Sequence, residues 1–178
     1  ATDTPHRKKK GLTMLDECTI SERWTGVDEM LKRWLDERQE ILVDLVDVNE
    51  AAAALSEDYT DLQTKLVTFC ELLMDYISAG HFEVYYQLVR EAEAFDDGSA
   101  VAAKALLPSI TETTEPVLEF NDKYVDTTAD LQQQQLSNDL SALLETLESR
   151  FEQEDRLIDL IHVAHREVAQ EEPAETPS

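Results

Sequence analysis

The stretch LSNDLSALLETLESRFEQEDRLIDLI, residues 136–161, decides the fold class of this 178-residue chain. Its apolar residues recur at steps of three, four and seven, which is the spacing of one face of an α-helix. They are Leu136, Leu140, Leu143, Leu144, Leu147, Phe151, Leu157, Ile158 and Ile161. The pattern predicts one long amphipathic helix from about Ala129 or Gln132 to about Val168.

The same periodicity recurs upstream of this helix. Apolar stripes run over residues 27–46, 59–77 and 82–95, and the third stripe ends at the turn signal Asp96-Asp97-Gly98-Ser99. We expect Ser56 to cap the start of the second helix. We expect Gly80 to end that helix in the left-handed conformation, so that a tight corner separates it from the third.

A further helical stretch, over residues 101–124, contains Pro108 and Pro116. Each proline lacks a backbone N–H, so the stretch should break into two or three pieces. Glycine and proline are otherwise scarce, with 4 and 5 residues, which argues against a sandwich or barrel. Long amphipathic helices with short connections predict an all-α antiparallel helical bundle of four to five long helices, one of them kinked by proline.

The two ends of the chain lack this periodicity. Residues 1–13 are polar and basic and predict a disordered N-terminal arm, while residues 171–178 predict a disordered acidic tail. The helical bundle is therefore expected to span residues 14–170.

The composition is strongly acidic, with 39 Asp and Glu against 15 Lys and Arg, a net charge of −24. Such a charge repels nucleic acid and anionic membranes and attracts basic protein surfaces. It also arises in proteins that only need to stay soluble, for example in a salt-rich cytoplasm, so it names no partner by itself. We expect a cytoplasmic protein that contacts neither nucleic acid nor membrane directly.

Other features agree with a cytoplasmic location. Cys18 and Cys70 are too few for a disulfide framework. No apolar run approaches the roughly 20 residues of a membrane span. A basic run over residues 7–10 lacks the apolar core of a signal peptide behind it, so export is not expected.

The sequence offers little chemistry for an enzyme. It has neither a glycine-rich phosphate loop nor a nucleophile elbow. A di-metal site in a helical bundle needs Glu-x-x-His motifs on two helices, and only His162 and His165 lie together on one helix. We expect no catalysis, no metal and no cofactor.

Two segments are unusual for a plain bundle. Residues 74–82 place a carboxylate, two aromatic rings, a hydroxyl and a histidine around the expected corner, which suits either a satisfied corner or an exposed contact. Glu154 falls on the apolar seam of the last helix, where a carboxylate needs a partner. We expect a structural ion pair or hydrogen bond to Arg33, His81 or a tyrosine such as Tyr85.

These segments carry a resemblance. The stretch from Phe69 through Asp75-Tyr76-x-Ser78-Ala79-Gly80-His81-Phe82-x-x-Tyr85 resembles the central motif of the Rsd/AlgQ family of bacterial anti-sigma regulators. Residues 33–43, 102–108 and 147–158 resemble its first helix, its kinked fourth segment and its last helix. The matches run in order over about residues 14–168.

The resemblance implies an activity. Family members bind region 4 of the primary sigma factor, keeping it from the polymerase core and from −35 promoter DNA as growth slows, and AlgQ-type members are linked to alginate gene expression. The alternative is a signalling adaptor that binds the phosphotransferase-system phosphocarrier or the alarmone synthetase/hydrolase. By position, the candidate sigma contacts are Asp75, Ser78 and Phe82, followed by Arg33, Trp34 and Tyr85, which also fit the core.

Overall fold

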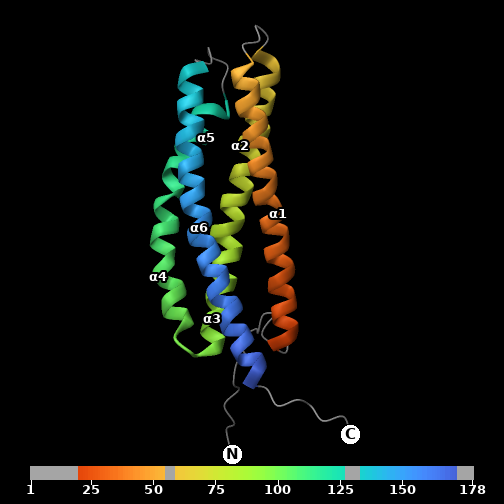
Figure 1. Ribbon diagram of the computed structural model, residues 1–178, viewed down its shortest axis with the longest axis vertical. Coiled ribbons are helices and arrows are strands. Elements are labelled where there is room, and N and C mark those ends of the chain that lie inside the picture. The colour runs from red at the N-terminus through yellow and green to blue at the C-terminus, as the bar shows by residue number, and fades with distance from the viewer. Residues whose placement is uncertain (1–19, 55–58, 127–132, 172–178) are drawn as a thin grey trace, which may run out of the picture.

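The computed structural model describes residues 20–54, 59–126 and 133–171. The elements in chain order are α1 (Ile20–Ala53), α2 (Tyr59–Ala79), the π-helical turn η1 (Gly80–Val84), α3 (Tyr85–Phe95), α4 (Ser99–Glu112), α5 (Thr114–Tyr124) and α6 (Gln133–Glu171). They form four rods, namely α1, α2–η1–α3, α4–α5 and α6, which run alternately up and down (Figure 1). The predicted all-α bundle is confirmed.

Each rod packs against its neighbours along an apolar stripe. α1 lies against α2 and α6, and the α4–α5 rod lies against α2–η1–α3 on one side and α6 on the other. α3 also reaches α6 across the bundle. One core therefore runs along the bundle, from Val27 and Ile161 at one end to Leu62 and Leu136 at the other.

The rod formed by α2, η1 and α3 is continuous, so the expected helix end at Gly80 is wrong. Gly80 is not left-handed, since among the described residues only Asp96 and Gly98 have positive φ. A Cβ atom at Gly80 would lie 2.9 Å from the Tyr85 hydroxyl oxygen and 3.2 Å from Cζ2 of Trp34. Glycine is required here by close packing, and a single π-helical turn takes the place of the expected corner.

The α4–α5 rod divides into two pieces, as expected, but at Thr113 instead of at a proline. Pro108 lies within α4, where Lys104, the residue whose carbonyl loses its N–H partner, is exposed and can bond water. Pro116 lies in the first turn of α5, where backbone N–H groups have no helical partner in any case. The break is instead a tight turn in which the Thr113 N–H donates to the Ile110 carbonyl at 3.1 Å.

The turn before α4 forms as predicted. Asp96 and Gly98 adopt left-handed conformations with φ of 49° and 88°, and the Ser99 N–H donates to Asp97 at 2.9 Å. The predicted arm at 1–13 and the cap at Ser56 lie outside the described residues, as does the predicted tail except for Glu171, the last residue of α6. No helix in the described ranges is long and apolar enough to cross a membrane.

Candidate partner-binding face and the buried polar cluster beneath it

Glu154 of α6 is completely buried and fully hydrogen-bonded. Its Oε1 accepts from the Tyr85 hydroxyl at 2.5 Å and from Arg150 Nε at 3.0 Å. Its Oε2 accepts from the Tyr76 hydroxyl at 2.5 Å and from Arg38 Nη2 at 3.0 Å. These five side chains, which we call the buried polar cluster, join α1, α2, α3 and α6.

Arg150 extends the cluster to the remaining rod. It is also completely buried, and its Nη1 donates to the hydroxyls of Thr113 and Thr114 at 3.0 and 3.1 Å and to the Ile110 carbonyl at 3.4 Å. Its Nη2 lies 3.1 Å from Nε2 of His81. The guanidinium thus satisfies the polar groups that the break between α4 and α5 exposes to the core.

The environment of the cluster fixes its protonation. Burial, reinforced by the Glu154 charge, raises the pKa of both Tyr76 and Tyr85, so both phenols stay protonated and donate. Burial, reinforced by the Arg150 charge, lowers the pKa of His81, so a neutral imidazole faces the guanidinium. The cluster therefore holds Glu154 between two arginines and two neutral phenols.

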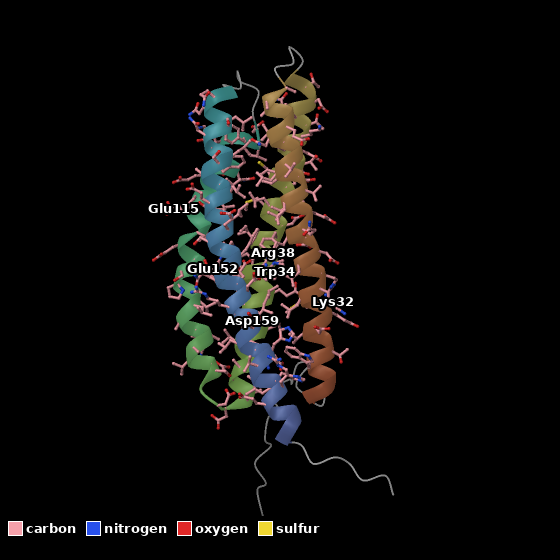
Figure 2. The ribbon with its side chains drawn as sticks, viewed as in Figure 1. Lys32, Trp34, Arg38, Glu115, Glu152 and Asp159 are labelled. Atoms are coloured by element: carbon pink, nitrogen blue, oxygen red, sulfur yellow. The ribbon has the colours of Figure 1, made fainter. Side chains whose placement is uncertain are left out.

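The predicted partners of Glu154 are partly confirmed. Tyr85 is one of them, but His81 contacts Arg150 instead of the carboxylate. Arg33 is wrong as a partner, because it is exposed on α1 while Arg38, further along the same helix, points inward. In Figure 2 Arg38 and Trp34 extend from α1 into the bundle and Lys32 extends away from it.

Two candidate contacts from the sequence are buried. Trp34 is stacked on Tyr76 at 4.7 Å between ring centroids, and its Nε1 donates to the Tyr76 carbonyl at 3.2 Å. Tyr85 is buried and bonded within the cluster. In the free chain both side chains belong to the core, whereas Arg33 is accessible.

The three leading candidates, Asp75, Ser78 and Phe82, are all exposed on one rod. Phe82 lies in the π-helical turn and is 86% exposed, which is extreme for an aromatic side chain. Tyr86, four residues on, is 58% exposed. Together with Glu83 and with Glu37 of α1, these residues form what we call the acidic–aromatic face.

Glu37 places a further acid at this face. Its pKa is raised, first by partial burial and then by repulsion from Asp75, Glu40 and Glu83, with Arg33 offsetting part of the effect. Its Oε2 has no hydrogen-bond partner. The face thus carries more negative charge than its own residues neutralise.

Sequence reasoning missed Glu37, Glu83 and Tyr86. Tyr86 could have been predicted from the sequence, because it follows Phe82 by four residues, a spacing that places two side chains on the same face of a helix. Glu37 was not, because it joins the face only through the packing of α1 on α2, which brings it near Asp75.

The described residues offer little for metal or thiol chemistry. No group of three or more histidine, cysteine or acidic side chains in the described ranges is arranged to hold a metal ion. Cys70 is buried, and burial raises the pKa of its thiol to about 12, which keeps it protonated and unreactive.

Fold and site together define an antiparallel helical bundle whose buried polar cluster supports an exposed acidic–aromatic face. A sequence model described as "Regulator of RNA polymerase sigma(70) subunit, Rsd/AlgQ" matches residues 14–162. Similar proteins named "Regulator of sigma D" occur in Yersinia pseudotuberculosis, 30% identical over 79% of this chain and 83% of the relative, and in Salmonella paratyphi B, 33% identical over 80% and 87%. The chain belongs to the Rsd/AlgQ family, and the resemblance seen in the sequence is confirmed.

Proposed function

We propose that this chain is an anti-sigma regulator that binds region 4 of the primary sigma factor through the acidic–aromatic face. Binding would keep sigma from the polymerase core and from −35 promoter DNA. The observation that carries the proposal is the almost fully exposed ring of Phe82, on the same rod as the exposed Asp75, a rod that the buried polar cluster holds in place. The description of the family as a regulator of the sigma(70) subunit supports the choice of partner.

The chemistry of the face suits this partner. Region 4 contains a helix-turn-helix, whose DNA-contacting surface must be basic to engage phosphates. Glu37, Asp75 and Glu83 offer carboxylates to the same arginine and lysine side chains. Burial, with repulsion from neighbouring acids, raises the pKa of the Glu37 carboxyl, and a cation that inserts beside it would offset the repulsion.

The exposed aromatic residues supply apolar surface that a partner can bury. Interfaces are held by a few buried anchors, among which tyrosine, tryptophan and arginine are enriched, while rim charges mainly set the rate of encounter. Phe82 and Tyr86 are free to be buried by a partner because the core does not use them. Ser78, exposed one helical turn before Phe82, can give or accept a hydrogen bond beside them.

The direct test is a calorimetric titration of the purified chain with isolated region 4 at several salt concentrations. We expect a one-to-one complex that weakens with salt but persists at physiological ionic strength, where the Debye length is about 8 Å and only close contacts keep their value. The complex should also release region 4 from labelled duplex DNA carrying the −35 element. Absence of a complex, or a ternary complex that retains the DNA, would contradict the proposal.

A further inference from the structure

An apolar groove lies between α1 and α6, away from the acidic–aromatic face. Its volume is about 230 Å³, and its walls include Leu42, Leu45 and Val46 of α1 and Leu140 and Leu144 of α6. Val46 is 54% exposed and Leu144 is 37% exposed. Apolar side chains gathered in one groove mark interaction sites more often than scattered ones do.

The helix surface around the groove is acidic. Residues 41–53 and 133–149, which form these parts of α1 and α6, contain no lysine or arginine. Glu50 lies one turn beyond Val46 and Glu148 one turn beyond Leu144, and both are exposed. A ligand of this groove therefore meets an apolar floor, and the nearby charged side chains on both helices are acidic.

We propose that this groove is a second docking surface, which takes a basic amphipathic helix from a partner protein. Such a helix places its apolar face on the groove floor and its lysines or arginines toward the acidic residues that surround it, a recurrent mode of peptide recognition. Charge complementarity selects a basic partner helix over an acidic or neutral one.

Charge also argues against a second copy of this chain as the occupant. Each copy carries a net charge of −24, and the parts of α1 and α6 beside the groove contain acidic residues and no lysine or arginine. Two such surfaces repel each other.

The apolar residues of the chain's own N-terminal segment lie too close to α1 in sequence to fill the groove. Its apolar residues Leu12, Met14 and Leu15 follow a basic run, so their chemistry is suitable. However, Leu42 lies about 33 Å along α1 from Ile20 at 1.5 Å per residue. Eight extended residues back from Ile20 span at most about 29 Å, which leaves even Leu12 short of the groove.

The groove and the acidic–aromatic face lie on opposite edges of α1. Glu37 faces Asp75 on the α2 side, whereas Leu42 and Val46 face Leu140 and Leu144 on the α6 side. Two partners can therefore bind at the same time, and the groove stands independently of the proposed sigma contact.

The test uses the full chain and a synthetic peptide of about 15 residues with leucines at helical spacing and lysines elsewhere. Anisotropy of the labelled peptide gives the Kd for wild type, for the double variant Val46→Ser with Leu144→Ser, and for the matched control Val101→Ser with Leu118→Ser. The control residues lie on the α4–α5 rod and carry the same side chains; Leu118 matches Leu144 in exposure, at 38% against 37%, and Val101, at 76%, is more exposed than Val46. Circular dichroism checks that all three chains keep their helical content.

We expect the groove variant to bind at least roughly tenfold more weakly than wild type and the control variant to bind equally well. A peptide with the same leucines and glutamate in place of lysine should not bind. Equal binding by wild type and groove variant would overturn the proposal, because the peptide would then be held by the overall negative charge of the chain and not by the groove. A wild-type dimer that the groove variant dissolves, seen by analytical ultracentrifugation, would also overturn it in favour of a second copy.

Discussion

Arg150 and Glu154 lie one helical turn apart on α6, both completely buried, with Nε and Oε1 3.0 Å apart. Through Arg38, Tyr85 and Thr113 this ion pair contacts each of the other three rods. The free-energy cost of removing two charges from water is about as large as the free energy gained from their mutual attraction in the core. We therefore interpret the pair as a device that fixes the register of the four rods more than as a source of net stability.

Replacing one member of this pair should be severely destabilising. Arg150→Met leaves the Glu154 carboxylate buried with less compensation, and we expect a loss of about 3–5 kcal/mol in the free energy of unfolding. Urea denaturation measures it. Arg156→Met is the matched control, since Arg156 forms the same one-turn pair with Glu152 on the same helix at 58% and 61% exposure. The control should lose less than about 1 kcal/mol. Equal losses would show that the buried position of the first pair has no special role.

Gly80 should not tolerate a side chain. Gly80→Ala forces a Cβ to within 2.9 Å of the Tyr85 hydroxyl oxygen, and we expect a loss of about 1–3 kcal/mol by overpacking. A double-mutant cycle with Tyr85→Phe tests the cause. Because the phenylalanine variant lacks the clashing oxygen, the alanine substitution should cost less in that background. If the losses in unfolding free energy caused by Gly80→Ala and Tyr85→Phe simply add in the double variant, the contact with the Tyr85 hydroxyl is not what requires glycine at this position.

The partial burial of His81 beside Arg150 should make stability depend on pH. Its pKa is lowered in the folded chain, so the unfolded chain binds more protons once the pH falls through the ordinary histidine range near 6.5. Stability from the neutral imidazole is therefore present above that range and is lost as the pH falls below it. Unfolding measured between pH 7.5 and 5.5 should show a decline that is smaller in His81→Gln. Identical slopes for the two proteins would contradict the assignment of a neutral His81 beside Arg150.

Phe82 should matter for binding and not for folding. Its ring is 86% exposed, so Phe82→Ala should change the free energy of unfolding by less than about 0.5 kcal/mol. As an interface anchor, its loss should weaken sigma region 4 binding by about 2 kcal/mol or more, near thirtyfold. Val101→Ala, at another exposed apolar position, should leave the Kd unchanged. A destabilised but fully binding Phe82→Ala would reverse this assignment.

Apolar periodicity was enough to predict the rods. The stripe from Leu136 to Ile161 predicted α6, and the helix predicted over 82–95 ends at Phe95, as α3 does. Periodicity works here because each helix buries one face, and that demand is local in sequence. It also left Asp75 and Ser78 off the apolar stripes, where the structure shows them exposed. It put Phe82 on the stripe of residues 82–95, however, whereas the ring is 86% exposed.

The features that the sequence did not predict depend on contacts between segments that are distant in the chain. A glycine that ends a helix and a glycine that admits a close neighbour have the same sequence signal, and only Tyr85 and Trp34 beside Gly80 distinguish them. Likewise the choice between Arg33 and Arg38 as a partner of Glu154 depends on how α1 lies against α6. One extra residue in the π-helical turn shifts the helical phase, which no local pattern in residues 80–84 indicates.

The affinity of two charge-reversal variants for isolated region 4, measured in parallel, tests the proposed sigma-binding face most directly. Asp75→Lys and Glu115→Lys both change the net charge by the same amount at exposed positions, but Glu115 lies on the α4–α5 rod and points away from the bundle in Figure 2. We predict that Asp75→Lys abolishes measurable binding while retaining wild-type helical content, and that Glu115→Lys binds as wild type does. Equal affinities for the two variants would contradict the acidic–aromatic face as the sigma-binding surface.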